Sequence, residues 1–237
     1  MLRLVISLVG LFSLTIGVAT AGEATILAAG GEGDHILRYR LDNGNIVSHF
    51  VADGVSSLDF PFAMTIGLDG SVLVCGWQSD AVHRYDRHTG QPLDDFIPSG
   101  QGGLDGPVYL LFHPDGSALA SSNGSNRVLK YDGVGGDFVE VLVSEGSGGL
   151  DYPHHVQIDD AGVMYLAGKH NNDILRFDAD TGDFIGLLVT SGSGGLNGPR
   201  GLLILPDTDV DFDADNDGDV DLADFGAFQQ AFTGPLP

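Results

Sequence analysis

One phrase recurs four times along the chain, each time 46 residues after the last. It reads GQGGLDGP, GSGGLDYP and GSGGLNGP in three copies and GVSSLDFP in the first, and its prolines are Pro61, Pro107, Pro153 and Pro199. Aromatic residues keep the same interval at Tyr39, Tyr85, Tyr131 and Phe177. A fixed period without insertions indicates a chain built from copies of one structural unit.

Each copy divides into short apolar runs separated by turn residues. In the fourth copy the runs span 155–158, 163–167, 174–177 and 184–189, and Gly, Asn and Asp lie between them. Such runs, rich in β-branched and aromatic residues and without helical periodicity, predict strands joined by tight turns. Four antiparallel strands in a repeat of about 40 to 50 residues is the size of one β-propeller blade.

The repeat motif is G-x-G-G-L-x-x-P, a D-x-x-G turn, and N-x-(V/I)-x-(K/R)-(Y/F)-D. This motif resembles the NHL-repeat family over about residues 25–207, and the resemblance implies an all-β propeller. The domain opens at 25–30, which matches the second strand of a blade, and ends at 199–207, which matches a first strand. We therefore expect about four 46-residue, four-stranded blades, closed when 199–207 completes the N-terminal blade and removes an exposed edge. Pairing of two chains is the alternative.

Three segments of different composition follow one another along the 237 residues. Residues 1–21 are typical of an export signal, with Arg3, an apolar run over 4–18 and a small-residue cleavage site before Gly22. The apolar run is shorter than the ~20 residues that span a bilayer, so we expect cleavage and no membrane span in the mature chain. Residues 22–207 form the predicted propeller and 208–237 a tail. The protein is expected to be secreted or extracytoplasmic, in the periplasm or outside the cell.

The formal net charge of −23 narrows the partners of this protein. Nucleic acid requires a basic surface, and an anionic membrane surface does too, so neither is expected to bind. An extracellular protein or a polysaccharide remains as the predicted ligand.

The two residues after each repeated proline differ in every copy. They are Phe62-Ala63, Val108-Tyr109, His154-His155 and Arg200-Gly201. We expect these pairs at one mouth of the central channel, where four side chains could converge on a ligand: Tyr109, His154, His155 and Arg200. They could act as donors for an anionic ligand or as a base with an electrophilic partner, and Lys169 and His170 are weaker candidates. The alternative is that a histidine after this proline only begins a strand.

The resemblance also bears on activity. Some NHL-like propellers are lyases that use a histidine and a metal at the central mouth. No second repeat-placed histidine faces His154 and His155 here. We therefore favour a non-enzymatic binding or adhesion module and keep a lyase or hydrolase with its site around His154 and His155 as the alternative.

The tail carries nine aspartates and neither Lys nor Arg over 207–234. Counted from Asp213, its spacing matches a calcium loop with glycine at position 6, Gly218. The predicted Ca²⁺ ligands are Asp213, Asp215, Asp217, Asp219, Asp221 and Asp224, with Asp219 binding through its main-chain carbonyl. Aspartate at position 12 and the lack of a preceding helix resemble a dockerin repeat more than a full EF-hand.

An apolar face follows the calcium loop. Leu222, Phe225, Phe228 and Phe232 recur at spacings that predict a short amphipathic helix. Dockerins normally pair two loops and this chain has one, so a cohesin-like partner, self-association of two tails and packing against the propeller all remain open.

Overall fold

The computed structural model of the protein describes residues 24–205, so the predicted signal segment and calcium tail lie outside the described residues. Every regular element in that range is a β-strand or a single 3₁₀ turn. None of the described elements is a helix of the length and apolarity needed to cross a membrane. The chain divides into two compact units, 1–201 and 202–237, and the first holds all the strands of the described residues.

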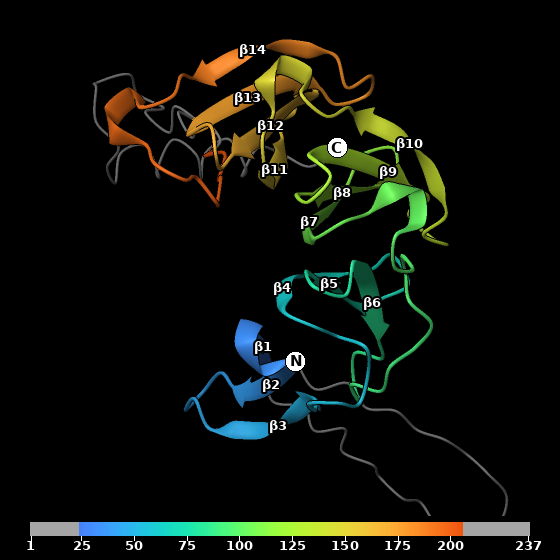
Figure 1. Ribbon diagram of the computed structural model, residues 1–237. Coiled ribbons are helices and arrows are strands. Elements are labelled where there is room, and N and C mark those ends of the chain that lie inside the picture. Colours follow the sequence, from blue (N-terminus) through green and yellow to red (C-terminus); the bar gives the residue numbers. More distant parts are fainter. Residues whose placement is uncertain (1–23, 206–237) are drawn as a thin grey trace, which may run out of the picture. The chain divides into compact units, whose positions relative to one another are not determined.

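The strands form four antiparallel sheets in chain order (Figure 1), which we call blades 1 to 4. Blade 1 holds β1 (Thr25–Gly30), β2 (His35–Arg40) and β3 (Ile46–Val51). Blade 2 holds β4 (Pro61–Ile66), β5 (Val72–Gly76) and β6 (Ala81–Tyr85). Blade 3 holds β7 (Pro107–Phe112), β8 (Ala118–Ser122), β9 (Arg127–Tyr131) and β10 (Phe138–Val143). Blade 4 holds β11 (Pro153–Ile158), β12 (Val163–Gly168), β13 (Asp173–Asp178) and β14 (Phe184–Val189).

Three of the four 3₁₀ turns in residues 24–205 lie at the same place in the repeat, after the last strand or segment of a blade. They are η2 (Gln101–Gly103), η3 (Ser147–Gly149) and η4 (Ser193–Gly195), whereas η1 (Gly31–Gly33) joins β1 to β2 within blade 1. The glycine-rich phrase of the repeat therefore forms the connection from one blade to the next.

Two blades have three strands, for different reasons. Blade 1 begins with what corresponds to a second strand, as the sequence predicted. In blade 2 the expected fourth strand is reduced to two isolated bridges, Tyr85 with Pro92 and Val82 with Ile97. Pro92 has no N–H to donate to a ladder, so the regular pairing is interrupted there.

The strand predicted over 199–207 is not formed by the described residues. Residues 199–205 have no strand structure, and β1 pairs with β2 alone. Within the described residues the sheet of blade 1 contains β1, β2 and β3, with β1 at its edge. Residues 206 and 207 lie outside the described range. Closure of a ring by this strand is therefore a correction to the sequence-based expectation for the chain as described.

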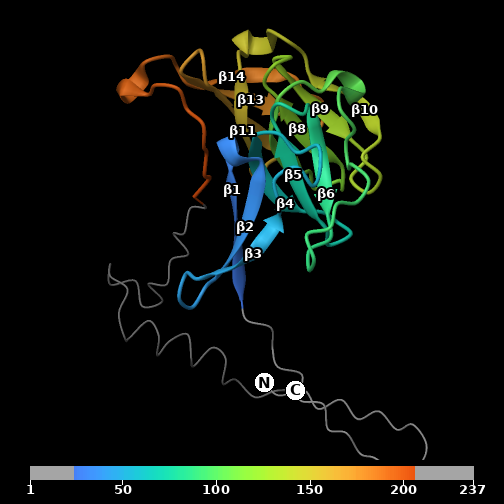
Figure 2. The same cartoon turned by 60° about the horizontal axis from the view of Figure 1, so that its bottom comes forward.

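The apolar core lies between blades. Three clusters of buried side chains each contain residues of two consecutive blades. Figure 2 shows the sheets of the blades next to one another. Phe50 packs with Tyr85 between blades 1 and 2, Phe96 with Tyr131 between blades 2 and 3, and Leu142 with Phe177 between blades 3 and 4. The aromatic residue that repeats every 46 residues is therefore a core residue of the inter-blade contact.

A side-chain clamp fixes each blade to the start of the next. Asp or Asn occupies the same turn in every blade, with left-handed φ values between 47° and 57°, which these residue types tolerate. Its Oδ1 accepts the N–H of the residue before the next repeated proline, at 2.7–2.8 Å. The four pairs are Asp34 with Phe60, Asp80 with Gly106, Asn126 with Tyr152, and Asn172 with Gly198.

Candidate functional site

The residues after each repeated proline lie where the innermost strands begin. The register of β11 against β12 shifts between Pro153 and Val156, and β4 and β7 show irregularities at the same place. Such a bulge changes the direction of successive side chains. His154 is buried and its neighbour His155 is half-buried, as expected for successive residues whose side chains point in different directions.

His154 is held by main-chain groups from the repeat that follows. Its Nδ1 lies 3.0 Å from the main-chain oxygen of Arg200, and because a carbonyl only accepts, Nδ1 carries the proton. The ring meets that of Phe62 edge to face, with centroids 5.3 Å apart. Burial lowers the pKa of His154 to about 4; the bond to Arg200 opposes that shift, and the charges of Arg200 and Lys169 add to it. The imidazole is therefore neutral near pH 7.

His155 belongs to a second cluster with Tyr109 of blade 3. The two ring centroids are 4.0 Å apart, and the amide nitrogen of Gln157 donates to Nε2 of His155 over 3.3 Å. Burial lowers the pKa of His155 and raises that of Tyr109. Both side chains are therefore uncharged at neutral pH.

Further aromatic side chains lie at the same end of the strands. Tyr152, just before Pro153, stacks on His170 with centroids 4.2 Å apart, and Nζ of Lys169 lies 4.5 Å from the Tyr152 ring centroid. In blade 2, Trp77 meets Phe60 edge to face. The two weaker candidates, Lys169 and His170, are thus part of an aromatic group.

Sequence reasoning missed Tyr152 and Trp77. Both occupy repeat positions that differ from blade to blade: Trp77 corresponds to Asn123 and Lys169, and its Nε1 donates to Oδ1 of Asn123 over 3.0 Å. The signal that singled out the residues after the prolines, variation within a fixed repeat, was present at these positions too.

The structure brings the four predicted mouth residues together in two pairs. Tyr109 and His155 contact each other through their rings, whereas His154 contacts Arg200 through the main-chain oxygen of Arg200. Arg200 itself is exposed. Binding of a ligand by these residues stays a prediction.

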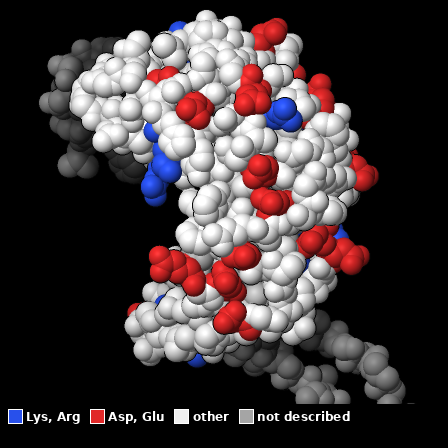
Figure 3. Space-filling view, viewed as in Figure 1, with Lys and Arg blue, Asp and Glu red and all other residues white. Residues whose placement is uncertain are grey.

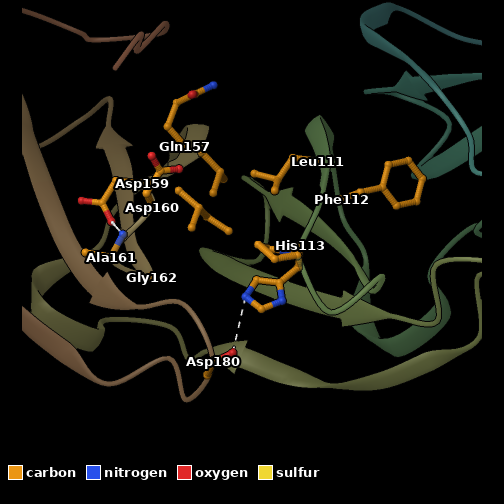
Figure 4. Close-up of a pocket in the computed structure, with 12 residues that line it drawn as sticks. Leu111, Phe112, His113, Gln157, Asp159, Asp160, Ala161, Gly162 and Asp180 are labelled. Carbon is orange, nitrogen blue, oxygen red and sulfur yellow. Dashed lines mark hydrogen bonds and ion pairs between the residues drawn. The ribbon is translucent and has the colours of Figure 1, made fainter. Parts of the chain in front are cut away.

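A cavity of about 640 Å³ lies at the other end of the innermost strands, between blades 3 and 4 (Figure 4). Leu111, Val156 and Ile158 supply apolar walls, and the polar lining includes His113, Asp159 and Asp180. Asp159 accepts the N–H groups of its own turn and the Tyr165 hydroxyl, and His113 lies 3.6 Å from Asp180. The polar groups of this cavity already stabilise turns of the protein. We therefore regard it as a weaker candidate for ligand binding than the predicted mouth around His154 and His155.

Blade 2 contains a serine, a histidine and an aspartate in series. Nε2 of His83 lies 2.8 Å from Oγ of Ser79, and its Nδ1 lies 2.8 Å from Oδ1 of Asp95. The connectivity is that of a hydrolase triad. His83 is buried at a position that is leucine in the other blades, and Ser79 also donates to the main-chain oxygen of Gly76. We interpret the series as a polar link that ties β6 to the irregular segment 92–97.

Metal binding at the mouth has no ligand set. Among residues 24–205, no three or more His, Cys, Asp or Glu side chains are grouped as a metal site would require. The predicted calcium ligands, Asp213 to Asp224, lie outside the described residues.

No family model matches the sequence, and no curated protein is detectably similar to it. Solved structures are similar in fold. Virginiamycin B lyase from Staphylococcus aureus superposes with a TM-score of 0.54 and 18% identity, over 77% of this chain and 57% of that one. A chain of the nidogen/laminin complex gives a TM-score of 0.55 and 18% identity, over 69% and 58% of the two chains.

The fold is a β-propeller. The dihydro-heme d1 dehydrogenase NirN is a third similar structure, with a TM-score of 0.52 and 16% identity over 75% of this chain and 36% of that one. This propeller therefore spans about half the length of the structures it matches, or less. At such identities the likeness establishes the fold, while function has to be argued from the propeller's own side chains.

Proposed function

We propose that the protein is a secreted binding propeller whose mouth takes a neutral carbohydrate, such as a segment of an extracellular polysaccharide. The observation that supports this most is the contact of Tyr109 with His155, two uncharged rings 4.0 Å apart with Gln157 beside them. Binding sites of this kind combine apolar and aromatic surface with a few placed polar groups. The rings offer flat faces to the C–H side of a sugar, and the hydroxyl of Tyr109, which can donate and accept, offers a hydrogen bond to a sugar hydroxyl.

Charge favours a neutral ligand over the anionic one considered first. The lowered pKa values of His154 and His155 leave both rings uncharged at neutral pH, so Arg200 and Lys169 are the cations near this end. Acidic side chains outnumber basic ones on the face shown in Figure 3. The formal net charge of −23 would in addition repel a polyanion from the protein as a whole.

Calorimetric titration with neutral and acidic oligosaccharides tests the proposal. We expect Tyr109→Ala and His155→Ala each to weaken binding of a neutral glycan at least tenfold, because each removes half of the ring pair. His88→Ala, in an exposed turn between β6 and the segment 92–97, is the matched control and should leave affinity unchanged. The proposal fails if no neutral glycan binds, or if all three substitutions have equal effects.

A lyase or hydrolase at the same mouth is the second candidate, because one of the similar structures is a lyase. The geometry gives it less support. Nδ1 of His154 is engaged by Arg200, and a histidine whose pKa is about 4 is a weak general base at neutral pH. Screening for turnover with the wild type and the double variant His154→Ala/His155→Ala separates the two: turnover that the double variant loses would favour the enzyme.

The tail adds the second part of the proposal. Six aspartates at calcium-loop spacing would hold one Ca²⁺ in the exported protein, and the apolar residues after them would bind a cohesin-like partner or a second tail. Its support is the position-by-position spacing of acidic residues and glycine. Sequencing the N-terminus of the exported protein tests the accompanying localisation: we expect the mature chain to begin near Gly22.

A further inference from the structure

Blade 4 presents an apolar face that its predecessors cover. Phe50, Phe96 and Leu142 occupy one repeat position in blades 1 to 3 and are 3%, 3% and 6% exposed, because the next blade packs on them. Leu188 occupies this position in blade 4 and is 52% exposed. Blade 4 therefore has an apolar residue, Leu188, at the position that makes the inter-blade contact, but in the described part of the chain no following blade covers it.

Blade 1 shows the opposite face of the same contact. The residues that pack against Phe50, Phe96 and Leu142 include Val72, Ala118 and Met164, which are 3%, 0% and 0% exposed. Ile26 is their equivalent in blade 1 and is 52% exposed. Two complementary apolar faces are thus uncovered in the same molecule, so they do not cover each other. An uncovered apolar surface of this kind marks an interaction site.

The exposed faces of blades 4 and 1 also match the inter-blade contacts in their main chain, as a glycine next to each contact shows. Gly90, Gly136 and Gly182 lie so close to the main-chain oxygens of Phe50, Phe96 and Leu142, respectively, that no Cβ would fit. Gly44 is the equivalent glycine in blade 1, with φ of 70°, and no atom of the described residues lies within 4 Å of the space its Cβ would take. The missing neighbour of Gly44 corresponds to the main-chain oxygen of Leu188.

The connecting turn gives a third match. Gly102 in η2 is covered by the ring of Phe138, and Gly148 in η3 by that of Phe184. Gly194 in η4 has no described atom within 4 Å of its Cβ position, and Ile46, the equivalent of Phe138 in blade 1, is 56% exposed. The side chain and the glycine that would meet are again both present and both uncovered within the described range.

We propose that blade 4 of one copy of this chain packs on blade 1 of a second copy, in the register of the inter-blade contacts within each chain. Leu188 then packs against Ile26, the Leu188 carbonyl lies on Gly44, and Ile46 covers Gly194. The contact is head to tail: each copy contributes blade 4 to one contact and blade 1 to the other. Two copies then close a ring of eight blades, and propellers typically have about four to eight blades.

Complementing variants of the full chain, studied by sedimentation and light scattering, test this contact. We expect the wild type to be a dimer and Ile26→Asp and Leu188→Lys each to be monomers at the same concentration. An equimolar mixture of the two variants should recover a dimer, because one of its contacts is wild type and the other brings together the two introduced charges, which are opposite in sign. Val134→Asp is the control, since Val134 is 70% exposed in a turn outside the face, and it should remain a dimer.

A second variant guards against loss of folding. Asn tolerates the left-handed conformation of Gly44, so Gly44→Asn should fold as the wild type does, by circular dichroism, and yet be monomeric because its side chain blocks the Leu188 carbonyl. A monomeric wild type would overturn the proposal, and a lower melting temperature in both face variants would then point to closure within one chain. A dimer that survives Ile26→Asp and Leu188→Lys, as association through the tails would, also overturns it.

Discussion

Among the single residues, His154 links the structure to pH. Burial lowers its pKa from 6.5 to about 4 in the folded protein, whereas the unfolded chain keeps a value near 6.5. Between these two values the unfolded chain binds a proton that the folded chain does not. The contribution of this residue to stability is therefore full above about pH 6.5 and is lost as the pH falls toward 4.

Replacing His154 with valine, the residue at the same place in blade 3, should remove this dependence. We expect urea unfolding between pH 7 and pH 4 to show the wild type losing on the order of 1–3 kcal/mol more than His154→Val over that interval. Carboxylates titrate in both proteins, so the difference between the two curves isolates the histidine. Parallel curves would show that His154 is not buried as a neutral ring.

At the scale of elements, most strands were predictable and the irregular ones were not. The runs expected in the fourth repeat correspond to β11 to β14 within two residues at either end, because alternating burial and turn residues fix strand limits locally. The prediction of a regular fourth strand in blade 2 was wrong because it followed the symmetry of the repeat and gave too little weight to Pro92. The aromatic group around Tyr152 was also missed, since it depends on which loops meet in space and not on any one segment.

The clamp between blades gives a prediction at this scale. Asn126→Ala removes the acceptor for the Tyr152 N–H and places a less tolerant residue at φ of 55°, so we expect a loss of about 1–3 kcal/mol in unfolding free energy. Asn126→Asp keeps an Oδ1 acceptor, as Asp80 does in the preceding blade, and is the matched control. Chemical denaturation measures both. Equal losses of unfolding free energy in the two variants would show that the hydrogen bond to the Tyr152 N–H does not account for the stabilising role of residue 126.

For the whole molecule, the repeat predicted the all-β propeller. Whether the end faces of blades 1 and 4 are covered could be seen only in the structure. Ring closure was inferred from the missing first strand of blade 1 and the surplus strand at 199–207. The exposure of Ile26 and Leu188 shows that both end faces of the described propeller are uncovered. Sequence periodicity specifies which faces match but cannot specify whether the matching face belongs to the same chain.

Calcium removal belongs to this scale because the tail carries much of the net charge of −23. We expect one Ca²⁺ per chain, with affinity in the broad ~10⁻⁷ to 10⁻³ M range of such loops, and a gain in helical circular dichroism on titration as the segment after the loop orders. Asp213→Ala/Asp217→Ala should abolish both changes. The calcium assignment is wrong if that variant binds as the wild type does, or if the spectrum does not respond to calcium.

The constant interval between clamp partners has a consequence for heredity. Asp34, Asp80, Asn126 and Asn172 all bind a residue 26 positions further on, and each lies 46 positions from the next. Unequal recombination between any two copies of the repeat in the gene would therefore add or delete a whole blade and leave every clamp with a partner. The number of blades can therefore change in a single genetic event, without an intermediate protein that is unable to fold.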